Sequence, residues 1–101
     1  MSVLMTLRVP GDAGKLEALA SEKPEVVQQI LARAREHGVQ AHRFYGTDEE
    51  LLIVDRWPDA DSFQRFMAAS PEVGELMAAA GVTGEPEITF WRALDVDDAI
   101  E

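Results

Sequence analysis

Two side chains near the middle of the chain could carry acid–base chemistry. His42 lies in residues 41–45, an aromatic-containing segment that is predicted to form a β-strand. Because a histidine side chain ordinarily titrates near neutral pH, His42 could act as a general base. Tyr45 could donate a hydrogen bond to an oxygen atom that gains negative charge during a reaction. Alternation along the strand sends His42 and Tyr45 to opposite faces, which counts against their convergence on one substrate.

Each of these residues also has a structural interpretation. His42 could form a hydrogen bond in an interface between subunits, and Tyr45 could be an amphipathic residue at a strand end or at the rim of a dimer. The other histidine, His37, precedes Gly38 at the predicted end of a helix. The helix dipole favours a positive charge there, so a structural role is expected for His37.

Aromatic and methionine side chains could line an apolar binding pocket. They recur at helical and strand spacing, so they could equally fill an ordinary hydrophobic core. A pocket between helices and sheet would use some of the same side chains as its walls. The candidates for a substrate-binding wall are Phe44, Trp57, Phe63, Phe66, Met67 and Phe90.

No motif for a cofactor or a metal accompanies these residues. The sequence has no glycine-rich phosphate loop, no Gly-x-Ser-x-Gly elbow, no cluster of metal ligands and no cysteine. We therefore expect no flavin, nicotinamide or zinc, and no serine-hydrolase chemistry. Arginines in the predicted strands, such as Arg8 and Arg56, are expected to pair with acids such as Asp55 or Glu87, or to hold an anionic ligand.

The charge of the chain bears on its partners and location. Nineteen acidic and nine basic residues give a net charge of −10, and no cluster of lysine and arginine interrupts it. Such a field repels phosphate backbones and anionic lipids, so nucleic-acid binding is not expected. No apolar run approaches the roughly 18–20 residues that span a bilayer. Without a leader-like start or any cysteine, the sequence favours a cytoplasmic protein.

The predicted elements follow the order β-α-β-β-α-β. This order is the ferredoxin-like plan, an α+β fold with a four-stranded antiparallel sheet and its helices on one face. Residues 1–94 are expected to form one such domain, followed by an acidic tail over residues 95–101. The strands are predicted at residues 3–9, 41–45, 51–57 and 87–94.

The helix starts are predicted from capping residues and proline. Helices are expected to end near Gly38 and Gly81, where glycine takes the left-handed conformation readily. The residues expected to begin or cap the helices are Asp12, Pro24, Asp59 or Asp61, and Ser70.

The third predicted strand is apolar on both faces, because Leu51, Leu52, Ile53 and Val54 follow one another. The helices can cover only one of those faces. The other would expose a large apolar patch to water. We therefore expect a homodimer in which two copies of the chain pack sheet against sheet.

The end of this strand resembles a known signature. Asp55-Arg56-Trp57-Pro58-Asp59, followed by Phe63 and Phe66, is similar to the acidic-x-Trp strand end and aromatic helix of the antibiotic biosynthesis monooxygenase-like group of dimeric α/β-barrel proteins. The resemblance extends from Val3 to Leu94. That group includes oxygenases, haem degraders, and cyclase-like and isomerase-like proteins, so the resemblance implies the fold more than a reaction.

The chain also departs from that group. Many members have a histidine where this chain has Phe66. The haem-degrading branch has an asparagine near Leu7, an indole near Phe66 and a histidine near Leu76 or Met77. All of these positions are apolar here, so haem degradation is not expected.

Two functions remain open on the sequence, and it does not decide whether the protein is an enzyme. The resemblance implies a cofactor-independent monooxygenase-like protein that acts on a small aromatic or polyketide-like substrate in an apolar pocket between sheet and helices. Its base would be His42 and its oxyanion donor Tyr45. Such a substrate, once deprotonated, can itself pass an electron to oxygen. The alternative is a non-catalytic dimeric barrel that binds a small apolar ligand or has a structural role.

Overall fold

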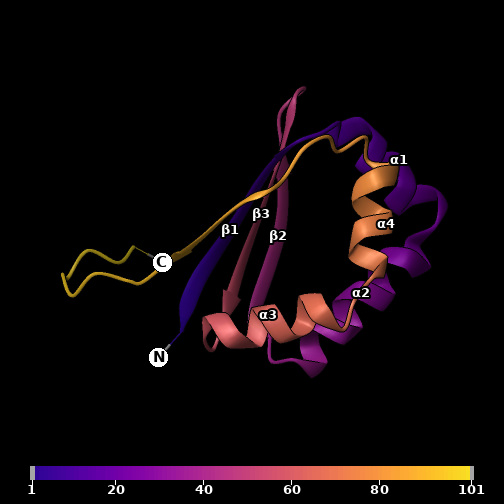
Figure 1. The fold of residues 1–101 in the computed structure, drawn as a ribbon. Coiled ribbons are helices and arrows are strands. Elements are labelled where there is room, and N and C mark those ends of the chain that lie inside the picture. Colours follow the sequence, from indigo (N-terminus) through magenta and orange to yellow (C-terminus); the bar gives the residue numbers. More distant parts are fainter. Residues whose placement is uncertain (1, 101) are drawn as a thin grey trace.

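Four antiparallel strands form one sheet in the spatial order β2-β3-β1-β4. The computed structural model describes residues 2–100, and its four helices lie on one side of the sheet (Figure 1). The predicted ferredoxin-like arrangement is therefore confirmed, with a pair of helices in each crossover. The elements are β1 (Val3–Pro10), α1 (Ala13–Glu22), α2 (Pro24–Glu36), β2 (Ala41–Gly46), β3 (Glu50–Trp57), α3 (Ala60–Ala68), α4 (Glu72–Ala79) and β4 (Glu87–Trp91).

Most of the predicted helix ends are confirmed. The carboxylate of Asp12 accepts a hydrogen bond from the backbone N–H of Lys15, and α2 begins at Pro24. Asp59, rather than Asp61, caps α3. Gly38 follows α2 with a φ of 97°, a conformation that other residues adopt only with strain.

Two predicted boundaries are wrong. Ser70 does not cap α4, because its hydroxyl makes no hydrogen bond among residues 2–100, and its backbone carbonyl accepts one from Val73 instead. The last strand ends at Trp91 and not at Leu94. Trp91 pairs with Leu4, close to the first residue of β1, so little of the partner strand remains to extend the ladder.

The sheet has one buried face and one exposed face. Met5, Leu7 and Val9 of β1 point toward the helices and are almost fully buried, as are Leu51 and Ile53 of β3. They join side chains from α3 and α4 in a single hydrophobic core. The exposed face carries several large apolar side chains, as predicted from the apolar third strand. These include Leu4, Tyr45 and Trp91.

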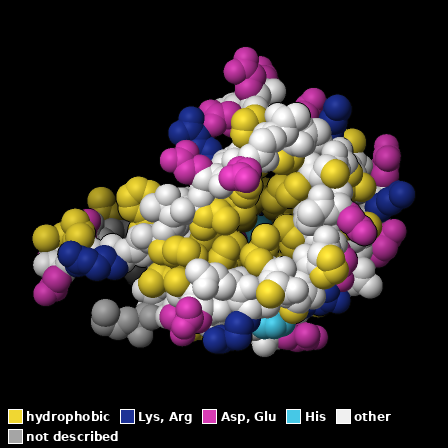
Figure 2. Space-filling view, in the orientation of Figure 1, with side chains coloured by type: hydrophobic (Ala, Val, Ile, Leu, Met, Phe, Trp, Pro, Cys, Tyr) yellow, Lys and Arg dark blue, Asp and Glu magenta, His cyan; other side chains and the backbone are white. Residues whose placement is uncertain are grey.

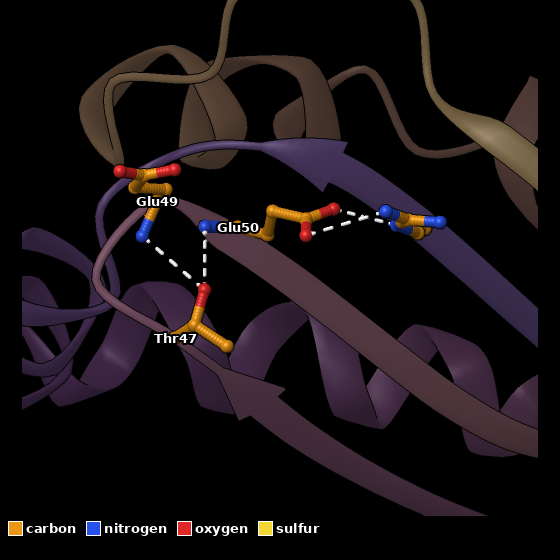
Figure 3. A network of polar contacts seen from close by, with 4 residues as sticks. Thr47, Glu49 and Glu50 are labelled. Carbon is orange, nitrogen blue, oxygen red and sulfur yellow. Dashed lines mark hydrogen bonds and ion pairs between the residues drawn. The ribbon is translucent and has the colours of Figure 1, made fainter.

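The turn between β2 and β3 fixes the register of those two strands (Figure 3). The hydroxyl of Thr47 accepts hydrogen bonds from the backbone N–H groups of Glu49 and Glu50, at 3.2 and 3.1 Å. The backbone N–H of Thr47 donates to the carbonyl of Glu50 at 2.9 Å. The resulting register places Phe44 opposite Ile53 and His42 opposite Asp55. A slip of one residue would send each of these side chains to the other face.

Residues 92–100 contain no helix or strand and extend away from the sheet (Figure 1). Leu94, Val96 and Ile100 are exposed along this segment. Met1, predicted within the domain, and Glu101, predicted in the tail, lie outside the described residues. Among the helices of residues 2–100, none is long and apolar enough to cross a membrane.

Candidate functional site

His42 and Asp55 face each other across the β2–β3 ladder. The distance from His42 Nδ1 to Asp55 Oδ1 is 2.7 Å. An ionised carboxylate can only accept hydrogen bonds, so Nδ1 of the imidazole carries the proton in this contact. Nε2 of a neutral His42 is then an acceptor with a free lone pair. This tautomer is the one that a general base requires.

The carboxylate of Asp55 is also held from its other side. Trp57 Nε1 donates a hydrogen bond to Asp55 Oδ2 at 3.2 Å. Asp55 and Trp57 are two residues apart in β3, so both point toward the helices, and they are 6% and 0% exposed. The indole packs against the rings of Phe63 and Phe66, with centroids 5.7 and 5.4 Å away. The aromatic core therefore fixes the indole, which in turn helps to orient the carboxylate.

His42 and Asp55 lie in the wall of a small cavity between the sheet and helices α2, α3 and α4. The cavity volume is about 50 Å³. Figure 2 shows hydrophobic side chains gathered around a hollow on this side of the molecule. Nε2 of His42 is buried and has no hydrogen-bond partner among residues 2–100. The remaining lining is apolar: Met5, Leu7, Val27, Ile30, Leu31, Ala34, Phe44, Ile53, Phe63, Phe66, Met67, Val73, Leu76 and Met77.

Four of the six residues predicted to bind substrate line this cavity, namely Phe44, Phe63, Phe66 and Met67. The rings of Phe44 and His42 make a T-shaped contact, with the ring planes at 89° and the centroids 4.5 Å apart. Trp57 and Phe90 do not line the cavity. Both stand behind Phe63, which lies 5.8 Å from the ring of Phe90. They support the wall without reaching a molecule inside it.

The structure does not bring Tyr45 to His42. Tyr45 is 54% exposed, on the face of the sheet that points away from the helices. There it lies beside a shallow groove with Arg8, Glu50 and Leu52. Strand alternation separates the two side chains as the sequence indicated.

Asp55 was predicted only as a partner for an arginine, and its link to His42 was missed. Arg8 binds Glu50 instead, with Nε donating to Oε2 at 2.5 Å and Nη2 donating to Oε1 at 3.3 Å. These hydrogen bonds hold the pKa of the Glu50 carboxyl below its usual value. Strand alternation offered one signal for this buried position, because it places Asp55 on the same face of β3 as Trp57.

Within residues 2–100, no group of three or more His, Cys, Asp or Glu could hold a metal ion.

Neither a protein-family model nor any curated protein matches this sequence. Solved structures do match, and they define the class: the chain has the fold of the antibiotic biosynthesis monooxygenase structures. Rv0793 from Mycobacterium tuberculosis matches with a TM-score of 0.61 and 17% identity, over 97% of this chain and 100% of that chain. The predicted resemblance is therefore confirmed for the fold.

Two further structures illustrate the class. SnoaB, a cofactor-independent oxygenase from Streptomyces nogalater, matches with a TM-score of 0.60 and 16% identity, over 97% of each chain. A proposed antibiotic biosynthesis monooxygenase from Deinococcus radiodurans matches with a TM-score of 0.63 and 17% identity, over 98% of this chain and 99% of that chain. At these identities the likeness establishes the fold, while the chemistry has to be argued from the side chains.

Proposed function

We propose that this protein is a cofactor-independent oxygenase in which His42 is the general base. One observation carries the proposal. The buried Nε2 of His42 has no partner among residues 2–100, faces an apolar cavity, and belongs to an imidazole whose Nδ1 is held by Asp55. A base oriented by a carboxylate is a recurring catalytic arrangement. SnoaB, which shares the fold, is a cofactor-independent oxygenase, and this supports the same reaction class.

The proposed substrate is a small aromatic or polyketide-like molecule with a CH₂ group that a carbonyl acidifies, either directly or across an aromatic ring. His42 Nε2 removes one proton, and Asp55 stabilises the imidazolium that forms. The resulting carbanion transfers one electron to O₂, which gives a substrate radical and superoxide. These two radicals combine into a peroxide anion, and the imidazolium of His42 returns its proton to form the hydroperoxide. Loss of water leaves a new carbonyl group. The carbon loses four electrons and O₂ gains four, so O₂ is the only oxidant.

The burial of His42 Nε2 against an apolar wall favours this sequence. An apolar wall excludes water and strengthens the attraction between the imidazolium and the carboxylate. Since Tyr45 lies on the other face, we no longer propose it as the oxyanion donor. The negative charge would instead be delocalised through the aromatic system of the substrate. A ring system is larger than the 50 Å³ cavity, so its binding requires flexible side chains such as Met67 and Met77 to move.

We also propose that two copies of the chain pack through their exposed sheet faces. The support is the apolar character of that face, which carries Leu4, Leu52, Val54 and Trp91. A second copy would remove this surface from water and leave the cavity on the opposite face accessible. A cytoplasmic location belongs to the same proposal and is supported by the cysteine-free sequence.

The test is oxygen uptake with anthrone, whose CH₂ group lies between two aryl rings and is activated by a carbonyl. We expect wild-type protein to consume one O₂ for each anthraquinone formed, faster than buffer alone. His42→Ala should lower kcat by about 10²-fold or more. His37→Ala is the matched control, because His37 is absent from the cavity lining. Uptake that is no faster than in buffer, or that survives in His42→Ala, would contradict the proposal.

A second candidate function is the storage or transport of a small apolar ligand. The observation in its favour is the lining itself, in which His42 and Asp55 are the only polar members drawn from residues 2–100. Native mass spectrometry of protein purified from a rich extract distinguishes the two candidates when combined with the oxygen assay. A dimer that retains an apolar molecule but never consumes oxygen would favour the binding protein.

A further inference from the structure

An open groove meets the cavity at His42. It lies between the end of α2 and the start of β2 and has a volume of about 240 Å³. His42 and Leu31 line both the groove and the cavity. The groove therefore reaches the same histidine as the cavity, from the side of α2 and the start of β2. The rest of its lining consists of Arg35, Val39, Gln40 and Ala41.

Of the described residues 2–100, Arg35 is the one charged residue that lines this groove, apart from His42, which is charged only when protonated. It is exposed, and it forms no ion pair with any acid among residues 2–100. Arg33, two residues earlier in the same helix, is bound to Glu72 and donates to the carbonyl of Ala69 at 2.9 Å. Seven of the nine lysines and arginines, Arg35 among them, form no ion pair within residues 2–100, so what distinguishes Arg35 is its place in the groove.

Two carbonyl groups near the end of α2 are paired with backbone donors of the following turn. The carbonyl of Arg35 accepts a hydrogen bond from Gly38 N–H, and that of Ala34 accepts one from Val39 N–H, both at 3.0 Å. These contacts leave fewer unpaired carbonyl groups at the negative end of the helix dipole. The guanidinium of Arg35 is the positive charge that the groove offers to an anion.

We propose that this groove binds the carboxylate of an aromatic acid, with Arg35 as the residue that selects it. The guanidinium has the planar fork that matches a carboxylate. The ring of the ligand would lie against Leu31 and Val39, with its far edge at His42. This inference rests on the proposed function for the role of His42, and it narrows the substrate class to aromatic acids.

The experiment compares two probes of nearly equal shape, 2-naphthoate and 2-naphthamide, which differ in charge at pH 7.5. Isothermal titration calorimetry should give a Kd for naphthoate that is roughly five- to tenfold lower than for naphthamide, as expected for one partly exposed charged contact. Arg35→Gln should abolish this preference, and Arg35→Lys should retain part of it. Naphthoate should also shift the amide NMR signals of Gln40 and Ala41.

Lys23→Gln is the control, since it removes the same charge at the opposite, exposed end of α2. It should keep the full preference for naphthoate. Equal affinity for both probes, binding of neither probe, or an unchanged preference in Arg35→Gln would overturn the inference. If naphthoate is preferred but no oxygen is consumed with any substrate, the proposed reaction fails while the anion site stands. If anthrone is oxidised without a preference for naphthoate, only the anion site fails.

Discussion

His42 and Asp55 are bound to each other across two neighbouring strands, with Nδ1 and Oδ1 2.7 Å apart, and both line the same apolar cavity. The side chain of Asp55 is almost fully buried, so water does not compete for this contact. The other oxygen of the carboxylate accepts from Trp57. The imidazole is thereby oriented with Nε2 available, and this arrangement is what separates the site from an ordinary hydrophobic core.

Asp55→Asn should impair catalysis without removing the side chain. The amide can present its NH₂ group to His42 Nδ1, which favours the tautomer with the proton on Nε2 and leaves no base toward the cavity. We expect kcat for anthrone oxidation to fall by about 10²-fold or more, by analogy with carboxylate-to-amide changes behind a catalytic histidine. Stopped-flow oxygen consumption measures this. An unchanged kcat would exclude Asp55 as the orienting group.

Trp57→Phe should show whether the indole N–H matters beyond packing. The ring contacts with Phe63 and Phe66 are largely kept, but Asp55 Oδ2 loses its donor in a buried place. Leaving that acceptor unpaired should cost about 1–3 kcal/mol in the free energy of unfolding. The pH profile of kcat should also move, which a loss of packing alone would not produce. Trp91→Phe is the control for the pH profile, since its indole donates to Thr6 on the face of the sheet that points away from His42.

The local features of the fold were predictable, while the site depended on long-range register. Asp12 and Asp59 cap helices through contacts three residues away, so the sequence contains the whole signal. His42 and Asp55 are thirteen residues apart and meet only because the intervening turn aligns the two strands. By contrast, the alternation of side chains along a strand was enough to predict that Tyr45 and His42 lie on opposite faces of the sheet. The end of β4 could not be predicted, because it is set by where its neighbour begins.

Thr47→Val should weaken the hairpin that sets this register. The substitution keeps the shape of the side chain but removes the hydroxyl that accepts from Glu49 and Glu50. We expect a loss of about 0.5–1.5 kcal/mol in the free energy of unfolding, measured by urea denaturation. Thr83→Val is the matched control, because Thr83 is exposed in a loop. Equal effects of the two substitutions would contradict a special role for Thr47.

The α3 cap should make stability depend on pH at the acidic end. The carboxylate of Asp59 accepts from the backbone N–H and the hydroxyl of Ser62, at 2.7 and 2.8 Å, and these hydrogen bonds lower its pKa below the usual 3.8. The stabilisation is therefore complete above about pH 4 and is lost as the pH falls through the lower pKa of the folded state.

Thermal unfolding of Asp59→Ala across this pH range tests the cap. Its Tm should lie below that of wild type by several degrees at pH 6. The difference should shrink steadily as the pH drops below 4. Asp59→Asn keeps a capping group that does not titrate, so its Tm should be close to that of wild type at pH 6. A difference that stays constant down to pH 2 would assign the effect to something other than the carboxylate.

Val54→Lys should separate the proposed dimer, because it places a charge in the middle of the exposed sheet face. Analytical ultracentrifugation should show a dimer for wild type and a monomer for the variant. Ala78→Lys on the exposed side of α4 introduces the same side chain elsewhere and should remain dimeric. A wild-type protein that sediments as a monomer would refute the sheet-to-sheet arrangement.

The proposed role of His42 as the base requires its proton to be on Nδ1, and ¹⁵N NMR of histidine-labelled protein shows which ring nitrogen is protonated without any substrate. At pH 8 we predict that His42 has its proton on Nδ1, with Nε2 giving the shift of an unprotonated nitrogen. Asp55→Asn should move the proton to Nε2. A wild-type His42 protonated on Nε2 instead, or one whose tautomer is unaffected by Asp55→Asn, would contradict the assignment of this side chain as the base.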